Sequence, residues 1–275
     1  MGRASVSISK GYWLLSKQHK VIVGLIIFYL SNVSFAETSD PCEQNILAVF
    51  RRPTVITSAC TTPRGKYTFE GGLEYLEFTN KSNGFMFPQS KVRMGLPGRN
   101  EFTVVFPNEN TNTKMASGLS ATQLSFKHNI FYNEHWNTAI RGMYIPASGS
   151  KIYGTAHDGY ALNGVLAYRI NSFNASVMLS YSSYSTSASM GGKRYNTVSP
   201  DALIGWEAKQ WLQLYAEVYG QINAGPKQGP AYNMDTGLLF LLSKNIAVDM
   251  EVGHRLTGHL GHFNIYYGAG FSVLF

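Results

Sequence analysis

Apolar and polar side chains alternate along most of the chain from Lys66 to the C-terminus. The last segment is the clearest case, because small or polar residues separate Phe263, Ile265, Tyr267, Ala269, Phe271, Val273 and Phe275. A period of two is that of a β-strand with one apolar face. The pattern therefore predicts an all-β protein.

Twelve such segments follow one another. They cover approximately 66–79, 85–96, 101–107, 118–131, 136–147, 160–170, 173–184, 197–207, 211–222, 233–242, 246–256 and 262–275. Short connections, such as 97–100 and 243–245, alternate with longer ones at 108–117, 148–159, 185–196, 223–232 and 257–261. Alternating turns and loops with an even strand number are typical of an antiparallel transmembrane β-barrel. We expect about 12 strands, with both termini on the periplasmic, short-turn side.

A secreted β-sandwich is the alternative, since it too is built of many short strands. Regularly alternating loop lengths favour the barrel, as do the aromatic residues at strand ends, where a barrel has its interfacial girdles. The terminal Phe275 resembles the signal read by the bacterial barrel assembly machinery. The expected partners are therefore this machinery, outer-membrane lipid and a small-molecule solute.

Composition narrows the class of protein further. Charged residues make up 14% and aromatic residues 13%, a combination that disordered chains and most soluble enzymes lack. The net charge is +7, but four basic residues lie in the first 36 positions, which leaves 19 basic against 16 acidic residues. An excess this small and dispersed gives no footprint for nucleic acid.

The first 36 residues are predicted to be a signal peptide. A basic stretch precedes the ten-residue apolar run Val21–Leu30, which is too short for a membrane-spanning helix, and cleavage is expected after Ala36. An uncleaved anchor is the alternative. Export implies three parts, the signal peptide 1–36, an N-terminal periplasmic segment 37–65 and a barrel 66–275 in the outer membrane of a Gram-negative bacterium.

The two cysteines, Cys42 and Cys60, both follow the expected cleavage site. In an oxidising compartment they are expected to form a disulfide that ties down the N-terminal segment. Two unpaired thiols or a metal site are the alternatives, although no histidine lies near either cysteine in the sequence. Whether residues 37–65 enter the barrel stays open at this point.

Charged residues fall almost entirely on the inward parity of the predicted strands, as the cost of a charge in lipid requires. The candidate lumen-lining residues are Lys91, Arg93, Glu101, Lys127, Arg141, Arg169, Glu217, Asp249, Glu251 and Arg255. Glu70, Glu74, Asp201, Glu207 and Asp235 share that parity. Such side chains either form a structural network or line a path that selects solutes.

Four stretches resemble one family of outer-membrane proteins. They are Lys91–Phe102, Leu214–Gly220, Asn245–Asp249 and Gly268–Ser272, in that order. Together they are similar to the MetA-pathway phenol-degradation-like family over roughly 65–275, with Cys42 and Cys60 outside the common core. The resemblance implies a barrel channel or transporter for small molecules, including aromatic or hydrophobic compounds.

Two other functions compete with transport. A barrel lipid hydrolase needs a serine and a histidine within reach of each other, but the His-x-Ser-Asn pattern of the twelve-strand phospholipase is absent. A non-transporting structural or adhesive barrel would be favoured by longer loops. We expect no catalytic residue, metal or cofactor, although His254, His259 and His262 cluster near the last long loop.

Deleting Phe275 is expected to impair assembly, because the most regular apolar strand face ends on this residue. The truncated protein should show less heat-modifiable, membrane-inserted material and more material in the periplasm. Normal insertion would count against the assembly signal but not against the barrel.

Overall fold

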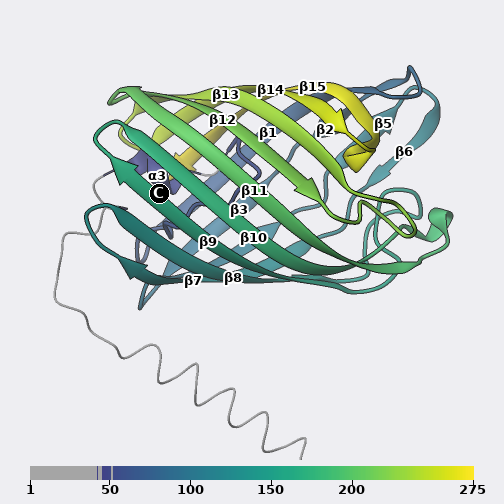
Figure 1. The fold of residues 1–275 in the computed structure, drawn as a ribbon, viewed down its shortest axis with the longest axis horizontal. Coiled ribbons are helices and arrows are strands. Elements are labelled where there is room, and N and C mark those ends of the chain that lie inside the picture. Colours follow the sequence, from purple (N-terminus) through teal and green to yellow (C-terminus); the bar gives the residue numbers. More distant parts are fainter. Residues whose placement is uncertain (1–41, 43–44, 51) are drawn as a thin grey trace, which may run out of the picture. The chain divides into compact units, whose positions relative to one another are not determined.

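A computed structural model describes residues 42, 45–50 and 52–275 (Figure 1). The predicted signal peptide 1–36 lies outside the described residues. The strands are β1 (Tyr67–Phe78), β2 (Asn83–Phe87), β3 (Lys91–Leu96), β4 (Asn100–Val105), β5 (Glu109–Asn112), β6 (Met115–Leu119), β7 (Gln123–Tyr132), β8 (Trp136–Ile145), β9 (Gly159–Ile170), β10 (Phe173–Ser185), β11 (Arg194–Lys209), β12 (Leu212–Gln221), β13 (Ala231–Ser243), β14 (Ile246–Thr257) and β15 (Phe263–Leu274). The helical turns are α3 (Ile46–Val49), η1 (Ala188–Met190) and η2 (Leu260–His262).

The strands form one antiparallel sheet that closes on itself. Each strand pairs with its neighbour, and β1 pairs with β15 from Thr68↔Leu274 to Phe78↔Phe263. Closure leaves no unpaired sheet edge along β1 or β15. A membrane-spanning sheet must be closed in this way. The predicted all-β barrel is confirmed.

Fifteen strand segments make twelve barrel positions. Both β2 and β3 pair with β1, while β4 and β5 continue one another, as do β6 and β7. Two of the breaks contain Pro88 and Pro107, and proline has no N–H to donate to a ladder. The twelve predicted strands are confirmed with these interruptions.

The loop expected at 108–117 is wrong. Residues there form β5 and β6, a hairpin closed by a tight turn at 113–114. Its sequence is mostly polar, so alternation of apolar residues gave no strand signal. The ladder is instead made by backbone pairs such as Asn110↔Gly118.

The two ends of the barrel differ. At one end the connections are tight turns at 97–99, 133–135, 171–172, 210–211 and 244–245, and the C-terminus lies there (Figure 1). The opposite end carries the longer loops 146–158, 186–193 and 222–230. The turn 97–99 requires positive φ at Gly98 (+73°) and Arg99 (+56°), a conformation that glycine adopts freely. That the short-turn end faces the periplasm stays a prediction.

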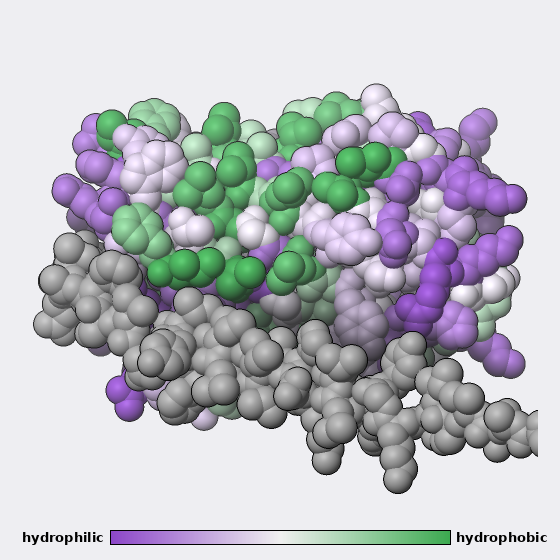
Figure 2. Space-filling view, turned by 60° about the horizontal axis from the view of Figure 1, so that its bottom comes forward, coloured by the Kyte–Doolittle hydropathy of each residue, from purple (hydrophilic) through white to green (hydrophobic). Residues whose placement is uncertain are grey.

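Apolar side chains cover the middle of the outer surface. Figure 2 shows them gathered between polar groups that lie toward the two ends of the visible face. Leu179, Ile204 and Met250 expose 61%, 67% and 63% of their surface. Aromatic pairs near the short turns include Phe173–Trp206 and Trp211–Phe240, as expected for an interfacial girdle. Within the described residues, no helix is both long and apolar enough to cross a membrane.

Leu179→Arg is expected to destabilise the folded protein in lipid vesicles by about 2–4 kcal/mol, because residue 179 lies mid-strand on the outer face. The matched control is Leu242→Arg, which is equally outward (59% exposed) but lies beside a short turn. Its cost should be about 0–1 kcal/mol. Equal costs in urea titrations would contradict the membrane-spanning orientation.

Candidate functional site: the occupied lumen

The described N-terminal residues lie inside the barrel. We call residues 42, 45–50 and 52–65 the plug. Its groups bond to inward-facing side chains at the starts or ends of wall strands, including Glu101 on β4, Asn137 on β8 and Glu207 on β11. These positions place the plug toward the short-turn end, and this answers the question left open by the sequence.

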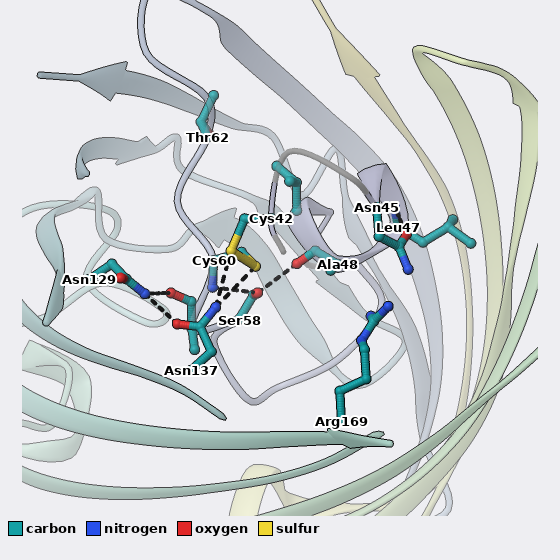
Figure 3. The surroundings of a disulfide bond; sticks show 12 residues. Cys42, Asn45, Leu47, Ala48, Ser58, Cys60, Thr62, Asn129, Asn137 and Arg169 are labelled. Atoms are coloured by element: carbon teal, nitrogen blue, oxygen red, sulfur yellow. Dashed lines mark hydrogen bonds between the residues drawn. A yellow bond between two sulfur atoms is a disulfide. The ribbon is translucent and has the colours of Figure 1, made fainter. Parts of the chain in front are cut away.

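The predicted disulfide between Cys42 and Cys60 is confirmed, with Cα atoms 5.4 Å apart. Figure 3 shows its surroundings, where Ser58 Oγ donates to Ala48 O (2.6 Å) and accepts from Cys60 N (3.0 Å). From the barrel wall, Asn137 Nδ2 reaches both sulfur atoms, at 3.1 and 3.4 Å. The disulfide therefore joins the two arms of the plug and lies against β8.

Two wall carboxylates accept hydrogen bonds from the plug backbone. Glu217 accepts from Val55 N (2.9 Å) and Ile56 N (2.6 Å). Glu101 accepts from Thr62 N (2.7 Å) and from the Thr62 hydroxyl (3.0 Å). The plug is outside the sheet ladders, so its buried amides need such partners.

Wall side chains with N–H groups bind plug carbonyls in the same way. Arg93 Nη1 donates to Val49 O (2.6 Å), and Asn129 Nδ2 donates to Ala59 O (3.1 Å). Lys127 Nζ donates to Ser58 O (3.1 Å) and to Cys60 O. The barrel interior thus supplies both donors and acceptors that match an irregular peptide.

The wall residues that hold the plug also form an ion-pair network. Arg93 contacts Glu70 (2.8 Å) and Glu101 (2.7 Å), and all three side chains are fully buried. Lys91 pairs with Glu70 at 2.7 Å, and Lys127 with Glu101 at 3.3 Å. Four of the ten candidate residues are therefore brought together on β3, β4 and β7. They satisfy each other's charge and fix the plug.

Arg52 anchors the plug to the part of the wall where β14, β15 and β1 lie side by side. Its guanidinium contacts Asp249 on β14 at 3.3 Å. Gly72 and Gly270 leave the space it occupies, since a Cβ at either position would lie 2.4 or 2.2 Å from an Arg52 atom. No signal in the sequence pointed to Arg52, because the plug has no strand periodicity.

Apolar contacts also hold the plug against the barrel wall. Leu47, Phe50, Ile56 and Ala59 share one buried cluster with inward wall residues. These wall residues are Ala139, Val165, Met178, Leu203, Tyr215, Leu239 and Ala247. The charged residues of inward parity did not predict these contacts. Leu203 and Leu239 have the same parity, and apolar residues that face inward indicate that the lumen is filled there.

The remaining candidates do not form one constriction. Glu251 contacts the Tyr215 hydroxyl (3.5 Å), and Arg169 pairs with Glu207 (2.7 Å) at the short-turn end. Arg255 lies at the long-loop end, where it donates to Gly258 O (3.2 Å). Arg255 therefore lies apart from Glu251 and Arg169, at the other end of the lumen.

Charges of opposite sign line opposite arcs of the lumen. Strands β11 to β14 carry the carboxylates Asp201, Glu217, Asp235, Asp249 and Glu251, all buried. Strands β3 to β8 carry Lys91, Arg93, Lys127 and Arg141, with Glu101 on β4 among them. Cationic side chains and most of the carboxyl groups therefore lie on different arcs of the lumen.

A cavity of about 110 Å³ lies between the plug and the wall at the short-turn rim. Its lining includes Phe50 and Leu47 of the plug, with Trp136, Tyr168 and Leu203 of the barrel. The rings of Trp136 and Tyr168 lie 4.6 Å apart and have the outward parity of β8 and β9. Leu47, Phe50 and Leu203 therefore give the cavity its apolar surface.

At the long-loop end, a carboxylate fastens the longest loop. Asp158 accepts from Ala147 N (2.8 Å) and from the Tyr144 hydroxyl (3.0 Å), and these two bonds hold its pKa below the usual range. In the loop between β14 and β15, His259 stacks on His262 with ring centroids 6.2 Å apart. Among residues 42, 45–50 and 52–275, no group of three His, Cys, Asp or Glu side chains is placed to hold a metal ion.

A hydrolase arrangement is also not observed in the described part of the chain. His128 Nδ1 contacts Asn100 Oδ1 (2.8 Å), and His135 Nδ1 lies 3.2 Å from Arg169 O. No hydrogen bond between a serine hydroxyl and a histidine ring is recorded among the described residues.

A closed twelve-strand barrel with an apolar outer band and a polar, charged interior defines the class of outer-membrane β-barrels. Within that class, the chain belongs to the family described as "Putative MetA-pathway of phenol degradation", whose model matches residues 50–273. The resemblance seen in the sequence is confirmed. Its estimated start near residue 65 is wrong, since the match extends into the plug.

Solved structures share the fold. The COG4313 outer membrane channel from Pseudomonas putida F1 has a TM-score of 0.60 at 9% identity, covering 81% of this chain and 100% of that one. The NanC porin has a TM-score of 0.52 at 14% identity, covering 75% and 98%. No curated protein matches the chain.

Arg93→Met is expected to destabilise the protein by about 3–5 kcal/mol, because it leaves two buried carboxylates without their shared cation. The control is Arg169→Met, which removes a partly exposed ion pair and should cost about 1 kcal/mol or less. Urea titration in vesicles measures both. A small loss for Arg93→Met would show that the network does not hold the barrel and plug together.

Proposed function

We propose that this protein is an outer-membrane channel for small solutes, and that the plug restricts its lumen. The observation that carries the proposal is the way the plug is held. Its backbone is bound by side chains such as Glu217, Glu101 and Lys127, and water or a polar solute offers the same hydrogen bonds. A segment bound in this way exchanges partners more readily than a fully apolar core does.

The width of the barrel supports a passage. Barrels of eight strands are filled by their own side chains, and those of sixteen or more leave a wide aqueous channel. Twelve strands lie between these cases, and here the plug occupies the short-turn half. Passage therefore requires the plug to shift or a solute to move along its side.

The solutes we propose are small and aromatic or otherwise amphiphilic. The rim cavity supports this class, because Leu47, Phe50 and Leu203 line it beside polar groups of the plug. The family description, which refers to phenol degradation, points in the same direction. The fold of the solved neighbours agrees with a channel but says nothing of the solute.

The proposal includes the expected cellular route. Residues 1–36 direct export, Phe275 is read by the assembly machinery, and the short turns face the periplasm. The plug then closes the periplasmic half of the lumen. This orientation follows from the rule that outer-membrane barrels keep short turns in the periplasm and long loops outside.

Loosening the plug is expected to raise conductance. In Glu217→Ala/Asp249→Ala, the acceptors for Val55 N and Ile56 N are lost, and Arg52 loses its carboxylate partner. Refolded protein in planar bilayers should then open more often, or in larger steps, than wild type. The control is Glu251→Ala, on the same wall, whose recorded hydrogen bond is to Tyr215 and not to the plug.

Two outcomes would contradict this proposal. If wild type and the double variant are both silent while remaining heat-modifiable, the barrel is structural and not a channel. If Glu251→Ala opens as much as the double variant, the anchors of the plug do not control passage.

A further inference from the structure

We propose that the lumen contains a subsite for the carboxylate group of a permeating solute. The subsite is built around Arg141 and Lys91, on the part of the barrel wall that faces the plug. This inference rests on the proposed channel function and names the charge of the solute. The site is a cavity of about 100 Å³ between plug residues 54–57 and the wall formed by β3, β4, β7 and β8.

The cavity lies in the positive part of the lumen. Arg93 and Lys127 stand beside Lys91 and Arg141 on this arc, and the carboxylates among them are Glu70 and Glu101. Among the described residues of this arc, four cations stand beside two anions in a buried space. The cavity lining itself contains no acidic residue. An anion is therefore the ligand that this wall favours.

Arg141 is positioned to use that charge. Its Nε donates to Asn163 Oδ1 at 2.8 Å, and the Asn163 amide in turn donates to Ser180 Oγ. This chain of hydrogen bonds fixes the guanidinium by one edge. Among the described residues, no carboxylate lies within 4.0 Å of Arg141. The remaining N–H groups have the planar geometry that binds a carboxylate through two hydrogen bonds.

Neutral donors complete the site. The hydroxyl of Thr57 is 1% exposed and has no hydrogen-bond partner among the described residues, although it borders the cavity. Thr103, Ser125 and Gln123 add further polar side chains to the lining. A buried hydroxyl without a partner is costly, and a bound oxyanion would satisfy it.

The opposite arc offers an anion no partner of this kind. Asp201, Glu217 and Asp235 line β11–β13 there, so an anion is expected on the side where Arg141 lies. The Thr54–Thr57 stretch carries Val55 and Ile56 between two polar residues, which gives an aromatic or aliphatic body a place next to the carboxylate. The solute class is a small organic acid with an apolar body.

Calorimetric titration of the refolded full-length protein tests this site with three probes of similar shape. Benzoate should bind saturably, whereas neutral benzyl alcohol and cationic benzylammonium should not, at matched ionic strength. Arg141→Gln should weaken benzoate binding about tenfold or more, the scale of a lost charged hydrogen bond. Arg141→Lys keeps the positive charge but loses the planar guanidinium. Its affinity for benzoate should lie between that of wild type and that of Arg141→Gln. The control Arg194→Gln lies exposed at the long-loop end and should bind as wild type does.

The outcomes separate this site from the channel itself. If wild type does not bind benzoate, or if all three probes bind equally, the subsite is overturned even when the protein conducts. If both Arg141 variants bind benzoate as wild type does, the residues named are wrong. Saturable, Arg141-dependent binding by a protein that never conducts would support the subsite and reject the channel.

Discussion

The structure depends on how charged side chains are buried inside a barrel. Arg93 and Glu101 are fully buried, and each contacts both an opposite charge on a neighbouring strand and a group of the plug. Without these contacts, both charged groups would need water as a partner, because an unpaired charge in the barrel interior is strongly unfavourable. The plug therefore belongs to the interior of the protein as much as the inward side chains do. Barrel and plug each supply what the other lacks.

The charged side chains also make one side of the lumen different from the other. Carboxylates such as Asp201 and Asp235 face cations such as Arg141 and Lys91 from different arcs of the wall. The plug crosses between them, with Arg52 bound to the acidic arc through Asp249 and Thr62 bound to Glu101. The residues that anchor the plug, such as Glu101 and Asp249, therefore belong to these same two arcs.

The strands could be predicted from the sequence because the lipid outside and the polar lumen inside impose a period of two, as residues 263–275 show. The disulfide followed from the compartment, and the inward parity followed from the cost of charge in lipid. The plug could not be predicted, because irregular backbone carries no period and its partners are distant in sequence. Glu217 illustrates the gap: its parity was predictable, but its bonds to Val55 and Ile56 were not.

Backbone hydrogen exchange in the plug tests the central claim most directly, namely that wall carboxylates hold this segment inside the lumen. The amides of Val55, Ile56 and Thr62 donate to Glu217 and Glu101, and we predict slow exchange for all three in the refolded protein. In Glu217→Ala, Val55 and Ile56 should exchange faster while Thr62 stays protected. Rapid exchange of all three amides in the wild-type protein would contradict the account.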